Sequence, residues 1–478
     1  MQWEKYREPA KSVLLGGLIC SAMFLTCRVW IYGELMPMQK FSVGGMLQFL
    51  RNGMTQGYAT LSSNTLQAGD NHLFIPNVVQ VTKDGETQTV AVNARQLYDT
   101  HVLVRDLLVS MYSGTTVRVT KSVSQEEWQQ AVQSDGVLLD FGTQLTSNLY
   151  WEYLGENGMK DTRIEDFSFR YLCVVRGKGV YFRGVQGETV LLPMTTGAPV
   201  TDVIDMVRSM QQGRGQYHFA WQDGSAVVQQ ALERGLSADQ LLPEQAVYVP
   251  VLEVSNPLSA DNAELRQQWK DKILQYFSYN PATLMYYTTD EGENYVESSS
   301  ILRLDYDGTV EYRASEGKRG ISILTESNSA DGALSEYELV RGVYEFLSRM
   351  DPTLRGGDAQ IRYVGMREGD EDSITLYFRY NCEGVDIYDT SISEAEGCSI
   401  QVEVQGGYIT HLTMRMRNYV VREGRLPVLR VQAALASLGQ AQQGSNYALE
   451  MYYLDDASDS VVTAGYWQWQ QKIDRTEN

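Results

Sequence analysis

The feature that most limits how this chain can fold is an uncharged segment near its N-terminus, from Ser12 to Cys27. A single Arg28 interrupts it before the apolar and aromatic run 29–32. A helix over 13–32 would be about 30 Å long, which matches the hydrocarbon core of a bilayer. The pattern predicts a transmembrane helix at 12–32, and no later stretch is long and apolar enough to predict a second one.

Residues at the two ends of this segment suit a membrane interface. Lys11 and Arg28 have long charged side chains that can reach the headgroups, and Trp30 and Tyr32 are amphipathic aromatic residues. We expect these four side chains to anchor the span at the membrane surfaces.

Small residues recur along the predicted span. Gly17 and Ser21 are four positions apart, Gly16 and Cys20 have the same spacing, and Cys27 lies seven positions beyond Cys20. Small residues at this spacing let a second helix approach closely. They therefore form a candidate site for contact with a partner helix.

The charges that flank the span predict its orientation. Basic residues precede it, the last of them Lys11, and Glu34 follows it. The positive-inside rule then places 1–11 in the cytoplasm and the C-terminal region outside, as a single-pass protein of the cell membrane. The alternative is a cleaved secretory signal peptide, which requires small residues at its cleavage site. Bulky residues occupy 28–32 instead, and this favours the uncleaved anchor.

The composition of the chain restricts its function. Its 478 residues carry a formal net charge of −20, and an acidic surface repels phosphate backbones, so nucleic acid is excluded as the expected partner. The four histidines are far apart in sequence, and the chain has no HExxH, GxSxG or phosphate-loop motif. We expect no catalytic residue, no metal and no cofactor, and hence a protein that is not an enzyme.

Two segments have both a functional and a structural interpretation. The run 305–308, Asp-Tyr-Asp-Gly, begins like a calcium loop, but the remaining ligands are missing and a type I′ hairpin turn fits better. His411 alternates with Thr413, Arg415 and Arg417. This pattern is typical either of an anion-binding stripe or of an exposed sheet face.

Segments with helical spacing alternate with paired strand segments along the rest of the chain. A helix is predicted at 98–112, a capping box at 124–127 opens another, and hairpins follow one another from about 283. The predicted fold class is α+β, with a single N-terminal transmembrane helix followed by a multi-module extracytoplasmic region of antiparallel sheets packed with helices. The expected domains are a cytoplasmic tail (1–11), the transmembrane helix (12–32), an N-terminal mixed helical domain (33–160), a central α+β domain (161–282) and a C-terminal α+β domain (283–478).

Three of the five cysteines, Cys173, Cys382 and Cys398, lie outside the predicted span. Cys382 and Cys398 either pair across a loop or remain reduced. We favour buried free thiols, because an odd number of cysteines does not indicate a disulfide framework.

Several stretches resemble proteins of the YycH family. Residues 11–32 have the Lys-Ser-x-x-Leu start, uncharged span and Trp-x-Tyr exit of that family. Residues 275–281 resemble an F-x-D-P element that follows a helix, although Asn280 replaces the acidic residue, and 295–312 is similar to the Tyr-rich hairpins after it. Residues 359–438 resemble the related YycI proteins.

The resemblance implies an accessory protein of the sensor kinase WalK, also called YycG, which controls the cell wall in Gram-positive bacteria. The implied partners are a WalK-like sensor histidine kinase and a YycI-like protein. The expected function is a membrane-anchored, non-enzymatic regulator that acts through transmembrane and extracytoplasmic protein–protein contacts. The alternatives are an anchored binding module for cell-wall polymer or peptide, and an envelope hydrolase.

Overall fold

The structure is a computed structural model, and it describes most of the compact unit that runs from Ser63 to Asn478. The described residues are 73–90, 94–112, 121–156, 167–194, 199–210, 215–261, 263–280, 282–324, 334–370, 372–391, 397–438, 447–458, 461–462 and 465–471.

Sheet is the main secondary structure, with 43% of the described residues in strands and 27% in helices. No helix among them is long and apolar enough to cross a membrane. The longest one, α3 (Ala94–Tyr112), carries charged residues such as Arg105 and Asp106, which are costly in hydrocarbon.

This finding corrects two predictions. The predicted fold class, a transmembrane helix followed by α+β modules, is wrong in this form, because the described residues form a mostly sheet structure and contain no helix that could span a membrane. The predicted single-pass location in the cell membrane is likewise not supported. The predicted tail (1–11), the span (12–32), its contact residues Gly16, Gly17, Cys20, Ser21 and Cys27, and its anchors Lys11, Arg28, Trp30 and Tyr32 all lie outside the described residues.

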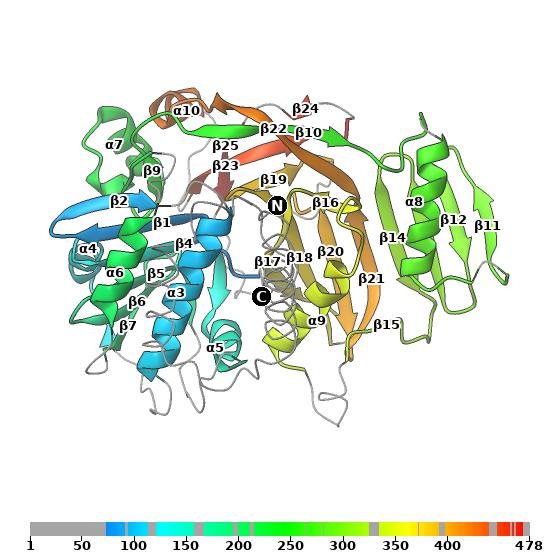
Figure 1. Cartoon of the computed structure of the whole chain (residues 1–478), viewed down its shortest axis with the longest axis horizontal. Helices are drawn as coiled ribbons and strands as arrows, with labels where there is room; N and C mark the ends of the chain where they lie inside the picture. The colour runs from blue at the N-terminus through cyan, green and yellow to red at the C-terminus, as the bar shows by residue number, and fades with distance from the viewer. Residues whose placement is uncertain are drawn as a thin grey trace, which may run out of the picture. The chain divides into compact units, whose positions relative to one another are not determined.

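The first large sheet is antiparallel and has seven strands. In spatial order they are β2 (Glu86–Val90), β1 (Val78–Lys83), β4 (Gly136–Thr146), β5 (Ser168–Val175), β6 (Gly179–Arg183), β7 (Thr189–Pro193) and β3 (Lys121–Ser122). Its helices are α3, α4 (Gln125–Val132), α5 (Ser147–Glu156) and α6 (Val200–Ser209). Figure 1 shows α3 and α6 in front of this sheet, and both contact β1. Helical cover explains why the central strands β5 and β6 are apolar and buried along almost their whole length.

The second large sheet has twelve strands. Ten form a path in the order β11 (Met285–Thr288), β12 (Gly292–Val296), β13 (Ser300–Asp305), β14 (Thr309–Ala314), β21 (Tyr408–Arg415), β20 (Ile400–Gln405), β18 (Ser373–Cys382), β19 (Val385–Asp389), β23 (Tyr447–Asp455) and β25 (Gly465–Gln471). Two strands lie off this path, β15 (Ile321–Ser322) on β21 and β17 (Gln360–Glu368) on β18. The pairing of β19 with β23 is parallel, and the other pairs are antiparallel.

Two smaller sheets and the remaining helices complete the described chain. One sheet has the order β16 (Arg355–Gly357), β22 (Arg417–Pro427), β10 (Tyr248–Ser255) and β24 (Val461–Val462), and the other pairs β8 (Tyr217–Phe219) with β9 (Leu241–Pro243). The helices are η1 (Ala220–Gln222), α7 (Ala226–Glu233), α8 (Ala263–Tyr276), α9 (Glu336–Ser348) and α10 (Val431–Leu438).

Local sequence signals predict several element ends. The predicted helix at 98–112 is confirmed as α3, which begins four residues earlier. The predicted capping box is confirmed in part, since the Ser124 hydroxyl accepts a hydrogen bond from the Glu127 amide at the start of α4.

The predicted domain boundaries at 160 and 282 stay predictions. Strand β4 pairs with β5 across the boundary at 160, and β10 pairs with β22 across the boundary at 282.

The turn at 305–308 joins two strands as predicted, but its type differs. Only Gly308 has a positive φ (+95°), and its amide donates to the carbonyl of Asp305 at 3.0 Å. Such a turn is a three-residue connection with glycine in the left-handed position, whereas type I′ requires two positive φ angles. Gly406 and Gly407 satisfy that requirement, with φ of +56° and +80° between β20 and β21.

Candidate functional site

A buried arginine on β5 connects the two large sheets. Arg170 donates to the carboxylate of Asp140 on β4 at 2.7 Å and to that of Glu450 on β23 at 2.6 Å. Asp140 belongs to the seven-stranded sheet and Glu450 to the twelve-stranded sheet. One guanidinium therefore bridges elements that are 280 residues apart in the sequence.

A second buried arginine makes the same connection from the other side. Arg362 on β17 donates to the carbonyl of Phe141 on β4 at 2.8 Å and to the side-chain oxygen of Asn77. It also forms an ion pair with Asp386 on β19, which accepts a hydrogen bond from Asn381 at 2.6 Å. Both arginine clusters have their carboxylates fixed by several donors, which is the condition under which a buried charge is tolerated.

A cavity of about 90 Å³ lies beside these clusters. Asp140, Arg170, Asp386 and Glu450 line it, together with apolar side chains that include Trp467. Its volume is well below the roughly 300–1,000 Å³ of a typical small-molecule site. The cavity has room for a few water molecules, which need roughly 10–15 Å³ each by the same measure.

The electrostatics of the cavity do not favour a general acid at Glu450. Burial opposes ionisation of Glu450, but the Arg170 guanidinium and the Tyr452 hydroxyl outweigh it and hold the pKa of this carboxyl below its ordinary value. A general acid needs the opposite shift. The described residues contain no group of three or more His, Cys, Asp or Glu placed to hold a metal ion. The arrangement supports a structural junction between two sheets.

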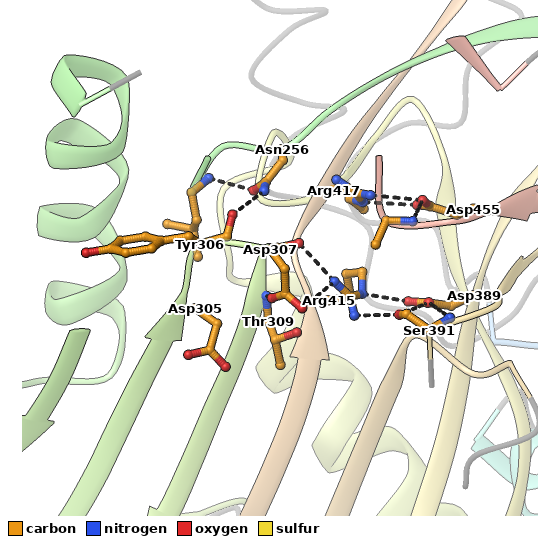
Figure 2. A network of polar contacts seen from close by, with 12 residues as sticks. Asn256, Asp305, Tyr306, Asp307, Thr309, Asp389, Ser391, Arg415, Arg417 and Asp455 are labelled. Atoms are coloured by element: carbon orange, nitrogen blue, oxygen red, sulfur yellow. Dashed lines mark hydrogen bonds and ion pairs between the residues drawn. The ribbon is translucent and has the colours of Figure 1, made fainter. Parts of the chain in front are cut away.

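The predicted polar stripe at 411–417 is divided between two environments: Arg415 and Arg417 are buried beside carboxylates (Figure 2), and His411 is partly exposed. Arg415, at the end of β21, is buried and donates to Asp389 at 2.9 Å. Arg417, at the start of β22, has 0% exposure and makes two bonds to Asp455, at 3.1 and 3.0 Å. These arginines are neutralised by carboxylates, so the interpretation as an anion-binding stripe is wrong for them. His411 pairs instead with Glu311 at 2.9 Å.

The favoured interpretation of the run 305–308 as a turn agrees with its contacts. Asp305 accepts from Arg303 at 2.7 Å, and the Asp307 carboxylate lies 3.1 Å from the guanidinium of Arg415. The Thr309 amide also donates to Asp307 at 2.8 Å. The Asp307 carboxylate therefore pairs the hairpin with β21 (Figure 2), and Asp305 pairs with a residue of its own strand.

The sequence contains a weak signal for the ion pair between Arg170 and Asp140. Asp140 follows the apolar run 137–139, and Arg170 stands between Phe169 and Tyr171. A lone charge in an otherwise apolar strand indicates a buried ion pair, because burying a charge without a partner is costly. The partner cannot be assigned from sequence, since it comes from a distant strand.

The cysteine prediction is confirmed for the described residues. Cys173, Cys382 and Cys398 are buried thiols, and none of the three is in a disulfide. Burial raises the pKa of the Cys173 thiol to about 12, which keeps it protonated and unreactive at neutral pH.

A buried histidine makes the fold sensitive to acid. His101 on α3 stacks on Tyr153 with ring centroids 5.7 Å apart and lies 3.2 Å from the Tyr150 hydroxyl. Burial, with a smaller effect of Arg105, lowers the pKa of His101 to about 3. The unfolded chain therefore binds a proton near pH 6.5 that the folded chain does not, so stability falls as the pH drops below 6.5.

We expect His101 to contribute a loss of about 2 kcal/mol in the free energy of unfolding between pH 7 and pH 5. Urea denaturation of the protein and of its His101→Phe variant at both pH values measures this contribution. The variant keeps the ring stacking and removes the titrating group, so its stability should change less between the two pH values. An equal change in both proteins would contradict the assignment.

Comparison with known proteins gives one informative match. No family model matches the chain, and no curated protein matches it either. The structure is similar to the crystal structure of YycH from Bacillus subtilis, with 10% sequence identity and a TM-score of 0.52 over 86% of this chain and 96% of that one. The fold is YycH-like.

A second solved structure is less similar. It is an uncharacterized protein from Eubacterium rectale, with 11% identity and a TM-score of 0.31 over 48% of this chain and 80% of that one. At 10% identity, the likeness to YycH shows the fold alone. The expected resemblance is thus confirmed for the fold, and the YycI-like nature of 359–438 stays a prediction.

Proposed function

We propose that this protein is a non-enzymatic regulator that binds a WalK-like sensor kinase of a cell-wall two-component system, together with a YycI-like protein. The observation that carries the proposal is the YycH-like fold, which covers 86% of the chain. The pairing of the cavity carboxylates with arginines also favours a binding protein over a hydrolase.

Regulation of this kind requires a difference in affinity. The protein changes kinase activity only if it binds one kinase state more tightly than the other. A coupling free energy of about 1–3 kcal/mol corresponds to a difference in binding affinity of about 5–150-fold. The contacts of Arg170 and Arg362 suit this task, because they hold the two large sheets together as one rigid unit that a partner could bind. The predicted contact residues at 16–27 lie outside the described residues and stay a prediction.

Co-purification of the full chain with the sensor kinase and the YycI-like protein tests the proposal. We expect both to be retained, and kinase autophosphorylation to change at least about fivefold when the chain is added. A matched control is the chain carrying the Arg176→Met substitution, which removes an exposed ion pair and should leave the effect unchanged. Retention of neither partner would refute the proposal, whereas binding to isolated cell wall would favour the polymer-binding alternative.

A further inference from the structure

The strand β11 is the terminal strand of the twelve-stranded sheet (Figure 1). It pairs with β12 on one side, from Met285 opposite Val296 to Thr288 opposite Glu293, and no described strand pairs with its other edge. An unpaired edge presents a row of backbone donors and acceptors that accept a further strand.

The side chains of β11 are exposed and apolar to a degree that is unusual for an edge. Met285 and Tyr286 are each 68% exposed, and Tyr287 is 56% exposed. Proteins normally protect edge strands with lysine, proline or a bulge, and β11 contains neither residue, nor does its pairing with β12 show a bulge. A strand of this kind is open to pairing with another chain.

The hydrogen-bond register identifies the groups that point outward. The Thr289 amide donates to the carbonyl of Gly292 at 2.8 Å, so these two residues form a hydrogen-bonded pair. Because such pairs alternate along an antiparallel ladder, Tyr287 and Met285 also bond to β12. The backbone groups of Tyr286 and Thr288 therefore face the free edge.

The two faces of the sheet next to β11 differ. Helix α8 and the segment after it cover one face, where Phe277 stacks on Tyr312 at 5.5 Å and Lys270 lies 3.4 Å from Glu293. Met285 and Tyr287 point to the opposite face, the same face as Ile301, which lies two strands away on β13 and is 40% exposed. An added strand would find apolar contacts there for every second side chain.

The charges around β11 indicate what kind of segment it would accept. Asp290 and Glu291 are exposed in the turn at one end of the strand, where Glu291 also pairs with Arg303 of β13 at 2.6 Å. Glu297 lies at the other end, where it accepts from the Asn280 amide at 2.8 Å. The hairpin 282–297 contains no Lys, Arg or His. A second copy of this chain would place acidic ends beside acidic ends in either orientation, which is unfavourable.

We infer that the free edge of β11 is a docking site for an extended segment of a partner protein, with alternating apolar residues and with lysine or arginine at its ends. The segment would add to the sheet through the outward backbone groups of Tyr286 and Thr288. It would place its apolar side chains beside Met285 and Tyr287, and its basic ends beside Asp290, Glu291 and Glu297. This inference assigns a contact surface to the proposed function and rests on that function only for the identity of the partner.

A fluorescent synthetic peptide, KKVTVTVKK, tests the docking site by binding to the full chain. The key variant is Thr288→Pro, which removes an outward amide without removing a bond to β12. We expect it to weaken peptide binding about tenfold, whereas the matched control Thr288→Val keeps the amide and should bind within about twofold of the original. The peptides EEVTVTVEE and KKVTPTVKK should each bind about tenfold more weakly than KKVTVTVKK.

Amide hydrogen exchange gives a second measurement that needs no variant. Binding of KKVTVTVKK should slow exchange at Tyr286 and Thr288, whose amides face the free edge. Absence of peptide binding, equal binding of the acidic-ended peptide, or unchanged exchange at both amides would overturn the inference. Self-association of the chain that Thr288→Pro abolishes would assign the edge to a second copy and would also overturn it. Peptide binding is measured without the kinase, so failure of the proposed function is recognised separately.

Discussion

Replacing Arg170 with methionine should lower the free energy of unfolding by about 3–5 kcal/mol. The substitution retains an apolar side chain in the junction but leaves the carboxylates of Asp140 and Glu450 without the guanidinium that lies 2.7 and 2.6 Å from them. Asp140 is only 2% exposed, so bulk solvent does not replace the lost donors, and the adjoining cavity has room for only a few water molecules. Equilibrium unfolding in urea, followed by tryptophan fluorescence, measures the change.

The matched control for this substitution is Arg176→Met, one residue beyond the end of β5. Arg176 also forms an ion pair, with Asp135 at 2.7 Å, but its side chain is 49% exposed. Exposed pairs contribute about 0–1 kcal/mol, and we expect the control to change stability by no more than that. Similar losses in both variants would show that burial of the Arg170 cluster is not the source of its effect.

Replacing Asp455 with asparagine should lower the free energy of unfolding by a similar amount, about 3–5 kcal/mol, because it disrupts the buried cluster around Arg417. The Asp455 carboxylate accepts two bonds from Arg417 and one from the Tyr419 hydroxyl at 2.6 Å. Arg417 has 0% exposure and would lose the carboxylate that makes two hydrogen bonds with it. The same urea titration measures this loss.

The nearby pair of Glu253 and Arg422 provides a control in the same small sheet. These side chains are 44% and 56% exposed, so Glu253→Gln should change the free energy of unfolding by less than about 1 kcal/mol. If Asp455→Asn were as mild as Glu253→Gln, the Arg417 cluster would have no special role in stability.

The junction also explains why the two sheets depend on each other. Arg170 and Arg362 belong to different sheets, and each donates to groups of the other sheet. Loss of either arginine should therefore destabilise both sheets together. The stability loss expected for His101 at low pH has a different origin, since His101 lies on the buried face of α3 and its pKa is lowered mainly by burial.

Local structure was predictable where a few neighbouring residues determine it. Ser124 begins α4 because its hydroxyl accepts a hydrogen bond from an amide of the first helical turn, and this needs no distant contact. The sequence predicted that 305–308 connects two strands, but it did not predict the turn type. A turn with one positive φ angle and a turn with two such angles differ in the register of the flanking strands, which the local sequence does not specify. His411 and Arg415 both belong to the alternating polar pattern at 411–417, yet only Arg415 of the two is buried.

The sequence by itself determined the acidic character of the chain, the positions of α3, α4 and the hairpin at 305–308, and the preference for buried free thiols. These depend on composition or on residues close together in the chain. Only the tertiary structure decided that Arg170 meets Glu450, that Arg417 meets Asp455, and that no described strand pairs with the outer edge of β11. Each of these depends on strands distant in sequence, and no local preference specifies which strand a buried charge or an open edge will meet.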